Sequence, residues 1–341
     1  MKDNKPSIKK IAELSGYSVA TVSRVINNNG RFSEDTRKKI LAIIEKTGYQ
    51  TNSVAKSLRM QKSNTIGILV PDISNYFFAK IVQQIEERLF EDDYSTIICN
   101  TARSLEKEKV YLSMLESKMI DGLVVISGLE KFNLHALTNS NIPVICIDRK
   151  PTDRNKSIFI SSNHYQGAFD ATNLLIKKGI KHPVIMVQDR NSSSLQERLR
   201  GFKDALKENN ITYSKEDNLL MIDSKSNVLS QKTNGIELFT SAFTKLRTCD
   251  GIFAINDDLA TLAIDGLEKL DIDIPDQVKI IGFDNSPIGQ HTSPKLTSVS
   301  HNIDEIVSIT CDNLRSLIQE PNKVLDKEYI VEVNLALRET T

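Results

Sequence analysis

Residues 11–27 read IAELSGYSVATVSRVIN, and this stretch decides the fold of the amino-terminal part of the chain. Apolar residues recur at helical spacing over residues 8–14, and the run stops at Gly16, where a left-handed turn suits glycine. After the turn, Ser18 can cap a second helix over residues 19–27 that has one apolar side and one small, polar side. Two short helices joined by a glycine turn predict a helix-turn-helix.

A third helix is predicted directly after this pair. Ser33 can cap it, acidic residues follow in its first turn, and Gly48 ends it. Its apolar side carries Ile40, Ile43 and Ile44. We therefore expect an all-α headpiece over residues 1–50, a hinge over 51–62 and a larger domain over 63–341.

Charge is distributed unevenly along the chain. The first 62 residues hold 13 of the 44 Lys and Arg residues but 5 of the 44 Asp and Glu residues, so the net charge of zero hides a basic head and an acidic body. A compact basic segment is expected where a protein neutralises DNA phosphates. A basic solvated tail would carry the same charge, but it would not show the helical pattern.

Length and composition exclude several classes of protein. A chain of 341 residues with 40% hydrophobic content can form two or three domains. No apolar run is long enough to span a membrane, and the first residues lack the apolar stretch of a secretory signal, so we expect a cytoplasmic protein. The four cysteines are far apart in the sequence, and we expect them to be reduced core residues without a metal or cofactor role: Cys99, Cys146, Cys249 and Cys311.

The stretch over residues 11–27 resembles the amino-terminal signature of the lactose/galactose repressor family of bacterial transcription regulators. The likeness continues through residues 33–48, the segment 49–59 and the larger domain. The resemblance implies a repressor that binds double-stranded operator DNA as a homodimer and responds to a small effector. The chain lacks the leucine-heptad tail that makes the lactose repressor a tetramer, which also favours a dimer.

In that family the first exposed residues of the second helix read base edges. Here these are Val19 and Ala20, which offer only apolar contact to a thymine methyl group, while Arg24 can also reach a base. Phosphate contacts are expected from Ser7, Ser18, Thr21, Ser23, Asn27 and Ser33. The alternatives are that Val19 and Ala20 merely fill a helix and that the hydroxyl residues only cap.

The resemblance assigns a hinge helix to residues 51–62 that forms when two copies meet over DNA. Its predicted DNA contacts are Asn52, Ala55 and Leu58, and Leu58 would wedge into the minor groove. The alternative is that Leu58 packs on its own domain. Thr51 stands where the family usually has proline, and this should loosen the linker.

From residue 64 onward, apolar strand-like runs alternate with amphipathic helical stretches, which is typical of parallel α/β lobes. We expect two doubly wound lobes, and the resemblance implies a periplasmic-binding-protein-like effector domain. The first lobe would hold about 63–161 and 292–321, and the second about 162–291 and 322–341. Ligands of such sheets bind beyond the carboxyl ends of the strands, so a cleft between the lobes is the predicted site.

Polar and aromatic residues lie where the strands are predicted to end. The candidate ligand-binding residues are Asp72, Asn75, Phe77, Phe78, Asp148, Arg149, Asn163, Arg198, Asn256, Asp284 and His301. Carboxylates, amides and arginines beside aromatic faces suit a polyhydroxyl ligand. For Asp72 the alternative is turn or cap chemistry, and for His301 it is a buried position between the lobes.

The effector is expected to be a sugar or a sugar phosphate that releases the repressor from DNA. A purine is the alternative, but the purine repressors have tryptophan and aspartate where this chain has Arg149 and Ser162, and the chain contains no tryptophan. A sugar-acting enzyme is the competing class, since Asp148 and Asp284 could face each other as a carboxylate pair. No catalytic or metal-spaced cluster of residues supports it.

Overall fold

The computed structural model describes residues 6–49, 62–128, 131–133, 137, 141–153, 157–189, 191–222 and 232–341, with the backbone alone for 232–234. The chain divides into two compact units, Met1–Ser63 and Asn64–Thr341. Each unit has its own hydrophobic core, and the two are described separately below.

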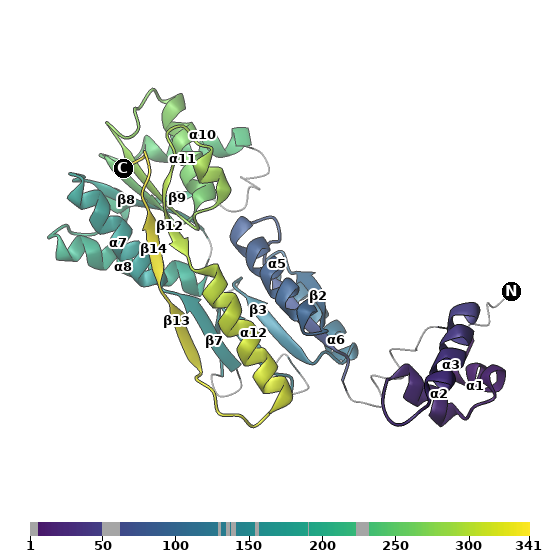
Figure 1. Cartoon of the computed structure of the whole chain (residues 1–341). Helices are drawn as coiled ribbons and strands as arrows, with labels where there is room; N and C mark the ends of the chain where they lie inside the picture. The colour runs from purple at the N-terminus through teal and green to yellow at the C-terminus, as the bar shows by residue number, and fades with distance from the viewer. Residues whose placement is uncertain are drawn as a thin grey trace. The chain divides into compact units, whose positions relative to one another are not determined.

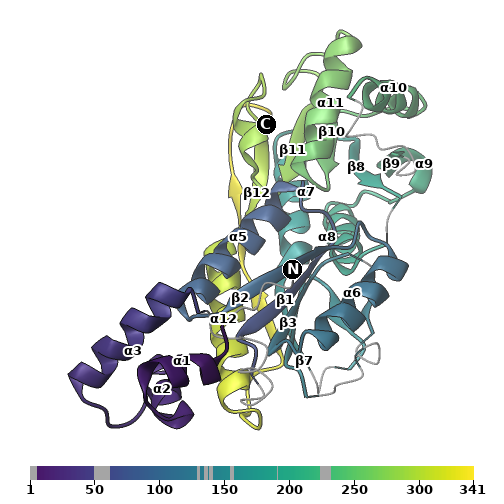
Figure 2. The same cartoon turned by 90° about the vertical axis from the view of Figure 1, so that its right-hand side faces the viewer.

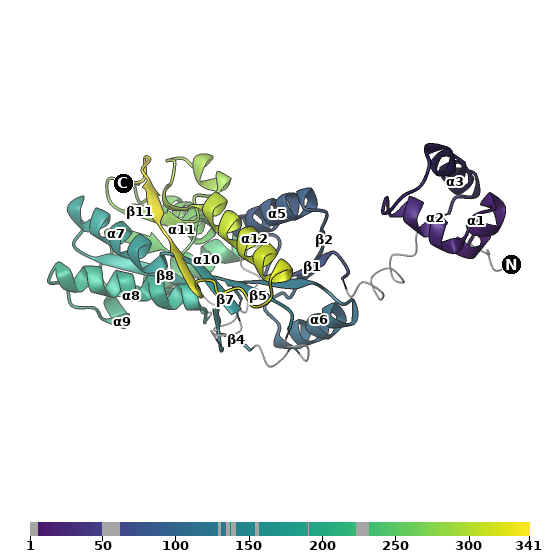
Figure 3. The same ribbon diagram turned by 60° about the horizontal axis from the view of Figure 1, so that its bottom comes forward.

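The first unit contains the three predicted helices: α1 (Ile8–Ser15), α2 (Val19–Ile26) and α3 (Glu34–Thr47) (Figure 3). The predicted serine caps each helix, and its side chain accepts a hydrogen bond from a backbone N–H of the first turn. Gly16 and Gly48 close α1 and α3 in the left-handed conformation, with φ of +73° and +63°. The local start and stop signals in the sequence are therefore confirmed.

The core of the headpiece is small. It consists of Ile11, Ala12, Val22, Val25 and Ile40, with Ile43 and Ile44 packed against it. All three helices contribute to this core, so their common apolar side fixes their arrangement and leaves the polar side of α2 at the surface.

The first lobe of the second unit is a six-stranded parallel sheet in the order β13-β7-β5-β3-β1-β2. The strands are β1 (Thr65–Val70), β2 (Ser95–Asn100), β3 (Gly122–Ile126), β5 (Val144–Ile147), β7 (Ser157–Ser162) and β13 (Glu328–Val331). Helices α5 (Tyr76–Glu91) and α12 (Ile303–Gln319) cover one face, and α6 (Leu105–Ser117) covers the other (Figure 2). A short two-stranded sheet joins β4 (Lys131–Phe132) to β6 (Lys150–Pro151).

The second lobe repeats this architecture in the order β14-β12-β11-β10-β8-β9. Its strands are β8 (Pro183–Gln188), β9 (Leu219–Ile222), β10 (Gly251–Ala254), β11 (Lys279–Phe283), β12 (Thr297–His301) and the antiparallel β14 (Val333–Ala336). Helices α7 (His164–Lys177) and α8 (Ser193–Glu208) cover one face, and α10 (Lys232–Phe243) and α11 (Asp257–Lys269) cover the other (Figure 1). The short helices α9 (Lys215–Asn218) and η2 (Pro287–Gln290) complete the lobe.

The predicted lobe boundaries are wrong in the last fifty residues. Strand β12 belongs to the second sheet although residues 292–321 were expected in the first lobe, and β13 belongs to the first sheet although 322–341 were expected in the second. Within the described residues the chain thus crosses between the lobes after β7, after β12 and after β13. The sequence of a short strand does not indicate which of two similar sheets the strand joins, because the pattern of its residues fits either sheet.

All four cysteines are free; three of them are buried, and Cys249 is partly buried. None of the described helices combines the length and the apolar character needed to cross a bilayer.

Helices α7 and α8 pack closely at Gly201. A Cβ atom built there would overlap the carbonyl oxygen of Tyr165 and lie 3.0 Å from the backbone nitrogen of Phe169. Because backbone cannot yield as a side chain end can, Gly201→Ala should lower the free energy of unfolding by about 2–3 kcal/mol. Urea denaturation measures this, with Lys207→Ala on the exposed side of α8 as the control. Equal stability of the two variants would contradict the close packing.

Candidate functional site

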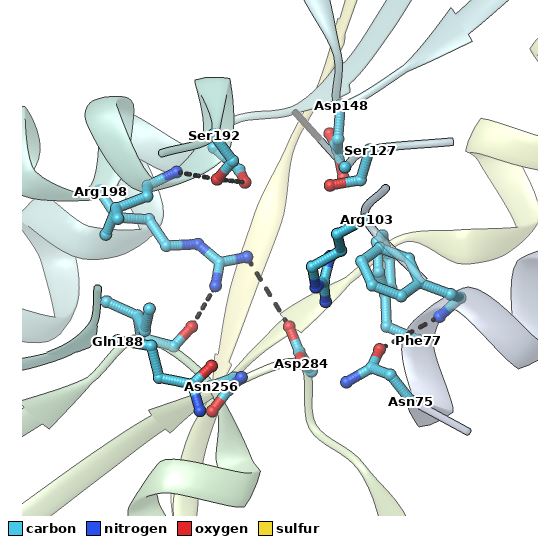
Figure 4. Close-up of a pocket in the computed structure, with 15 residues that line it drawn as sticks. Asn75, Phe77, Arg103, Ser127, Asp148, Gln188, Ser192, Arg198, Asn256 and Asp284 are labelled. Carbon is cyan, nitrogen blue, oxygen red and sulfur yellow. Dashed lines mark hydrogen bonds and ion pairs between the residues drawn. The ribbon is translucent and has the colours of Figure 1, made fainter. Parts of the chain in front are cut away.

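A cavity lies between the two lobes, at the carboxyl ends of the strands and the amino ends of the helices that follow them (Figure 4). About 680 Å³ of space inside it is free of protein atoms, and this space is continuous with solvent. Seven of the predicted ligand-binding residues line it: Asn75, Phe77, Phe78, Asp148, Arg198, Asn256 and Asp284. The structure thus brings together residues from both lobes that are far apart in the sequence.

Eight further residues line the cavity that sequence reasoning missed: Arg103, Ser127, Gly128, Gln188, Ser192, Ser194, Leu195 and Ile255. Four of them end or directly follow a strand: Ser127 and Gly128 follow β3, Gln188 ends β8, and Ile255 follows β10. The strand-end rule that selected Asp148 could therefore have found them. Arg103 comes three residues after β2, in a turn whose length the sequence does not set.

Helix caps supply three of the polar side chains in the cavity. Asn75, Ser192 and Asn256 each accept a hydrogen bond from a backbone N–H of α5, α8 or α11 at the start of the helix. Their positions are fixed by this capping, because the helix that each one caps is anchored in a lobe core. The amide group of Asn75 also reaches Asp258 at 3.4 Å.

The backbone turns sharply at the cavity wall. Four lining residues other than glycine have a positive φ: Arg103, Ser127, Asp148 and Asp284. Such residues cost about 1–3 kcal/mol each and cluster where function requires a particular side-chain direction. Both carboxylates of the cavity belong to this group.

Arg198 is the central cation of the cavity, and the surrounding protein holds it on several sides. Its Nε and Nη2 lie 3.3 and 3.2 Å from Nδ1 of His164, and its Nη1 donates to the carbonyl oxygen of Ile255. Nη2 is 3.7 Å from Oδ1 of Asp284, and the guanidinium lies 3.6 Å from the centroid of the Phe283 ring. Arg198 is thus presented to the cavity in one orientation (Figure 4).

Asp148 is held by one of its two oxygens. Oδ1 accepts hydrogen bonds from the hydroxyl of Ser161 and the N–H of Ser162, and Nε2 of His164 lies 2.8 Å from it. None of these contacts uses Oδ2. Burial alone would raise the pKa of Asp148, but His164 and the hydrogen bonds outweigh it and lower the pKa to about 2. Asp148 is therefore an ionised acceptor with one oxygen left for a ligand.

Asp284 differs from Asp148 in its protonation. Burial raises the pKa of Asp284 to about 7, although the Arg198 guanidinium opposes this. Behind it, burial and the Asp284 charge raise the pKa of Asp257 to about 7 as well. Asp257 is occupied, since it accepts from the hydroxyl of Ser298 and the N–H of Ser286.

Arg149 does not line the cavity, contrary to prediction. Its guanidinium is buried and makes two hydrogen bonds to the Glu108 carboxylate, at 2.7 and 3.2 Å, and one to the carbonyl oxygen of Lys131 at 3.0 Å. Arg149 follows a strand as predicted, but a buried partner on α6 turns its side chain away.

Three more predicted residues lie outside the lining of the cavity. Asp72 accepts hydrogen bonds from the N–H and hydroxyl of Ser74, which is the turn chemistry considered as its alternative. Asn163 caps α7 and lines a separate pocket. His301 lies behind Asp284, between the lobes. Among the described residues, no group of three or more His, Cys, Asp or Glu side chains is arranged to hold a metal.

The headpiece presents the predicted DNA-contacting residues at its surface. Val19 and Ala20 at the start of α2 are exposed, with 41% of Val19 accessible, although an apolar residue of this size usually lies in a core. Arg24, one turn further along, is also exposed. The predicted phosphate contacts Ser7, Ser18, Asn27 and Ser33 are exposed, and Thr21 and Ser23 are partly exposed. Asn52, Ala55 and Leu58, with Thr51, lie outside the described residues.

Comparison with known proteins agrees with the helical headpiece and with the two-lobed domain. Residues 7–52 match the family described as bacterial regulatory proteins, lacI family, and residues 172–341 match the periplasmic binding protein-like domain. An HTH-type transcriptional regulator named RegA, from Clostridium saccharobutylicum, is 35% identical over 331 residues, which cover 95% of this chain and 97% of that protein. The chain belongs to the lacI family. This lacI-family member is therefore a DNA-binding transcription regulator, and the predicted fold class is confirmed.

Two solved structures extend the comparison. A periplasmic binding protein/LacI transcriptional regulator from Alkaliphilus metalliredigens, complexed with D-xylulofuranose, is 31% identical, with a TM-score of 0.69, and covers 82% of this chain and 99% of its own. A lac repressor dimer bound to operator and an anti-inducer is 20% identical, covers 99% of each chain and has a TM-score of 0.82. The second likeness extends the lacI-family fold over nearly the whole chain.

Proposed function

We propose that this lacI-family regulator is a dimeric repressor of carbohydrate-utilisation genes, released from a palindromic operator when a sugar or sugar phosphate binds between the lobes. The observation that carries the proposal is the cavity in which Asp148, Arg198, Asn256 and Asp284 converge beside two phenylalanines. Hydroxyl groups both donate and accept hydrogen bonds, so this mixture of fixed acceptors and donors suits them.

The individual side chains of the cavity also suit a carbohydrate. Oδ2 of Asp148 can accept from a hydroxyl group, and Arg198 and Asn256 can donate to one. Phe77 and Phe78 lie 5.6 Å apart between ring centroids and offer apolar surface to the C–H face of a sugar ring. A related regulator at 31% identity is complexed with D-xylulofuranose, which supports the same class of ligand here.

A purine effector is the alternative, and two residues weigh against it. Arg149, which replaces the tryptophan of purine repressors, is bound to Glu108 away from the cavity. Ser162, which replaces their aspartate, lies 2.6 Å from His301. Neither the tryptophan nor the aspartate of the purine repressors therefore has a counterpart in the described lining of this cavity.

On DNA, two copies of α2 would lie in successive major grooves, with Val19 and Ala20 against thymine methyl groups and Arg24 at a base edge. The hydroxyl groups that cap α1, α2 and α3 would bond phosphates as well. Leu58 would wedge into the minor groove between the half-sites. No catalytic step is proposed, because Asp148 and Asp284 act as ligand acceptors in this scheme, and incubation with a sugar should yield no product.

The ligand half of the proposal is tested by a thermal-shift screen of the full chain. The panel contains pentoses, hexoses, disaccharides, sugar phosphates and purine bases, because a ligand that binds the folded state raises the melting temperature. We expect a sugar or sugar phosphate to raise Tm and the bases to leave it unchanged. A shift by hypoxanthine or guanine alone would overturn the carbohydrate class in favour of the purine alternative.

A further inference from the structure

His301 lies behind the cavity, at the point where the chain leaves β12 and crosses to the first lobe. Its side chain is fully buried. Nδ1 is 2.6 Å from the hydroxyl of Ser162, the last residue of β7 in the first lobe. Nε2 is 3.2 Å from Oδ1 of Asp284, which follows β11 in the second lobe and lines the cavity. One imidazole therefore connects the end of β7 in the first lobe to a cavity carboxylate of the second lobe.

The hydrogen-bonding partners determine where the proton of His301 lies when Asp284 is ionised. A carboxylate can only accept, so Nε2 carries the hydrogen and donates it to Asp284. A neutral imidazole has one N–H, so Nδ1 accepts from the Ser162 hydroxyl. Burial and the nearby Arg198 charge lower the pKa of His301 to about 3, against the opposing effect of Asp148, and keep the ring neutral.

The ring of His301 also supports the cavity wall. Phe77, which lines the cavity from α5, stacks on it with 4.0 Å between centroids and an angle of 26° between planes. His164, at the first crossing between the lobes, lies edge-on to it at 5.7 Å. A rotation of the lobes changes the contacts of His301 with Ser162 and Phe77, because these two residues belong to the first lobe and His301 ends a strand of the second.

We propose that His301 is a positioning residue that makes the ligand-binding orientation of Asp284 depend on closure of the two lobes. The relay runs from the Ser162 hydroxyl through the imidazole to Oδ1 of Asp284, and it leaves Oδ2 of Asp284 for the ligand. When the lobes separate, Ser162 withdraws and the orientation of the ring and of Asp284 is lost. A ligand that bonds to Asp284 therefore favours the closed arrangement. The inference rests on the proposed function in so far as the ligand occupies this cavity.

The relay itself can be tested without any ligand, by NMR of the full chain labelled with ¹⁵N at histidine, at pH 8, where Asp284 is ionised. The His301 signals are identified by their loss in His301→Gln. We expect a neutral ring with hydrogen on Nε2, and a shifted Nδ1 resonance in Ser162→Ala. Hydrogen on Nδ1, or a spectrum that Ser162→Ala leaves unchanged, would show that the relay does not exist.

The positioning role is tested by two variants that divide the properties of the ring. His301→Gln keeps one donor and one acceptor but loses the stack on Phe77, while His301→Phe keeps an aromatic ring and loses both hydrogen bonds. With D-xylulose as the probe in isothermal titration calorimetry, His301→Phe should weaken binding by about tenfold and His301→Gln by about threefold or less.

The reverse order, with Phe tolerated and Gln damaging, would mean that His301 only fills space and would overturn the positioning role. Circular dichroism and urea denaturation establish that both variants fold. If the wild-type protein does not bind D-xylulose, D-xylulose is excluded as the effector. The NMR experiment still tests the relay, because it uses no sugar.

Discussion

Arg198→Met is expected to weaken effector binding by about 100-fold or more while operator binding without effector stays within about threefold of wild type. The guanidinium reaches Asp284, His164 and the carbonyl oxygen of Ile255, so it is a charged donor held at the centre of the cavity. Losing two hydrogen bonds between this charged group and the ligand costs about 3–4 kcal/mol, and this cost sets the expected loss of affinity. Methionine keeps an unbranched stem against Phe283.

Arg200→Met on the same helix is the matched control. The Arg200 side chain is 58% exposed, pairs with Glu197 and does not line the cavity. Binding is measured by titration calorimetry with the sugar that gives the largest thermal shift. If Arg198→Met bound that sugar as tightly as Arg200→Met does, the cavity would not be the effector site.

Glu108→Ala should lower the free energy of unfolding by about 3–5 kcal/mol. The Arg149 side chain is 3% exposed, and removing the carboxylate would leave this cation buried with the carbonyl oxygen of Lys131 and the face of the Phe132 ring as its remaining described partners. The double variant Glu108→Leu with Arg149→Met removes both charges and should recover most of the loss.

Urea denaturation measures both effects, with Glu106→Ala on the exposed side of α6 as the control. Arg149→Met in combination with Glu108→Leu should leave effector affinity within about threefold of wild type, because neither residue lines the cavity. A loss of effector binding in the double variant, with stability retained, would instead favour the ligand contact that the sequence predicted for Arg149.

The headpiece was predictable because its signals are local. Ser7, Ser18 and Ser33 each cap a helix that begins at the next residue. Gly16 ends α1, and Gly48 ends α3. Cap and turn chemistry depends on residues within one turn of the chain, so the sequence alone carries it.

The cavity was predictable in part for a topological reason. In a parallel sheet the residue after each strand must lie at one edge, so Asp148, Asn256 and Asp284 were found without knowledge of their distances. The direction of a side chain at that edge depends on partners elsewhere in the chain. Arg149 turns toward Glu108, which is 41 residues away, and His301 bonds Ser162, which is 139 residues away. No local pattern reports such pairs.

The lobe assignment failed for a related reason. Strands β12 and β13 are only five and four residues long, and the chain crosses from the second lobe to the first between them, by way of α12. Hydrophobic pattern distinguishes a strand from a helix, but it does not distinguish between two sheets that would each bury the strand.

The affinity of the full chain for its operator, with and without sugar, tests the central claim most directly. The operator is first selected from random double-stranded DNA, and binding is then followed by fluorescence anisotropy of the labelled site at constant salt, since salt strongly affects such affinities. We predict a palindromic site, and a fall in affinity of at least about tenfold when the sugar that raises Tm is added, with no response in Arg198→Met. An operator affinity that the same sugar leaves unchanged would contradict the account.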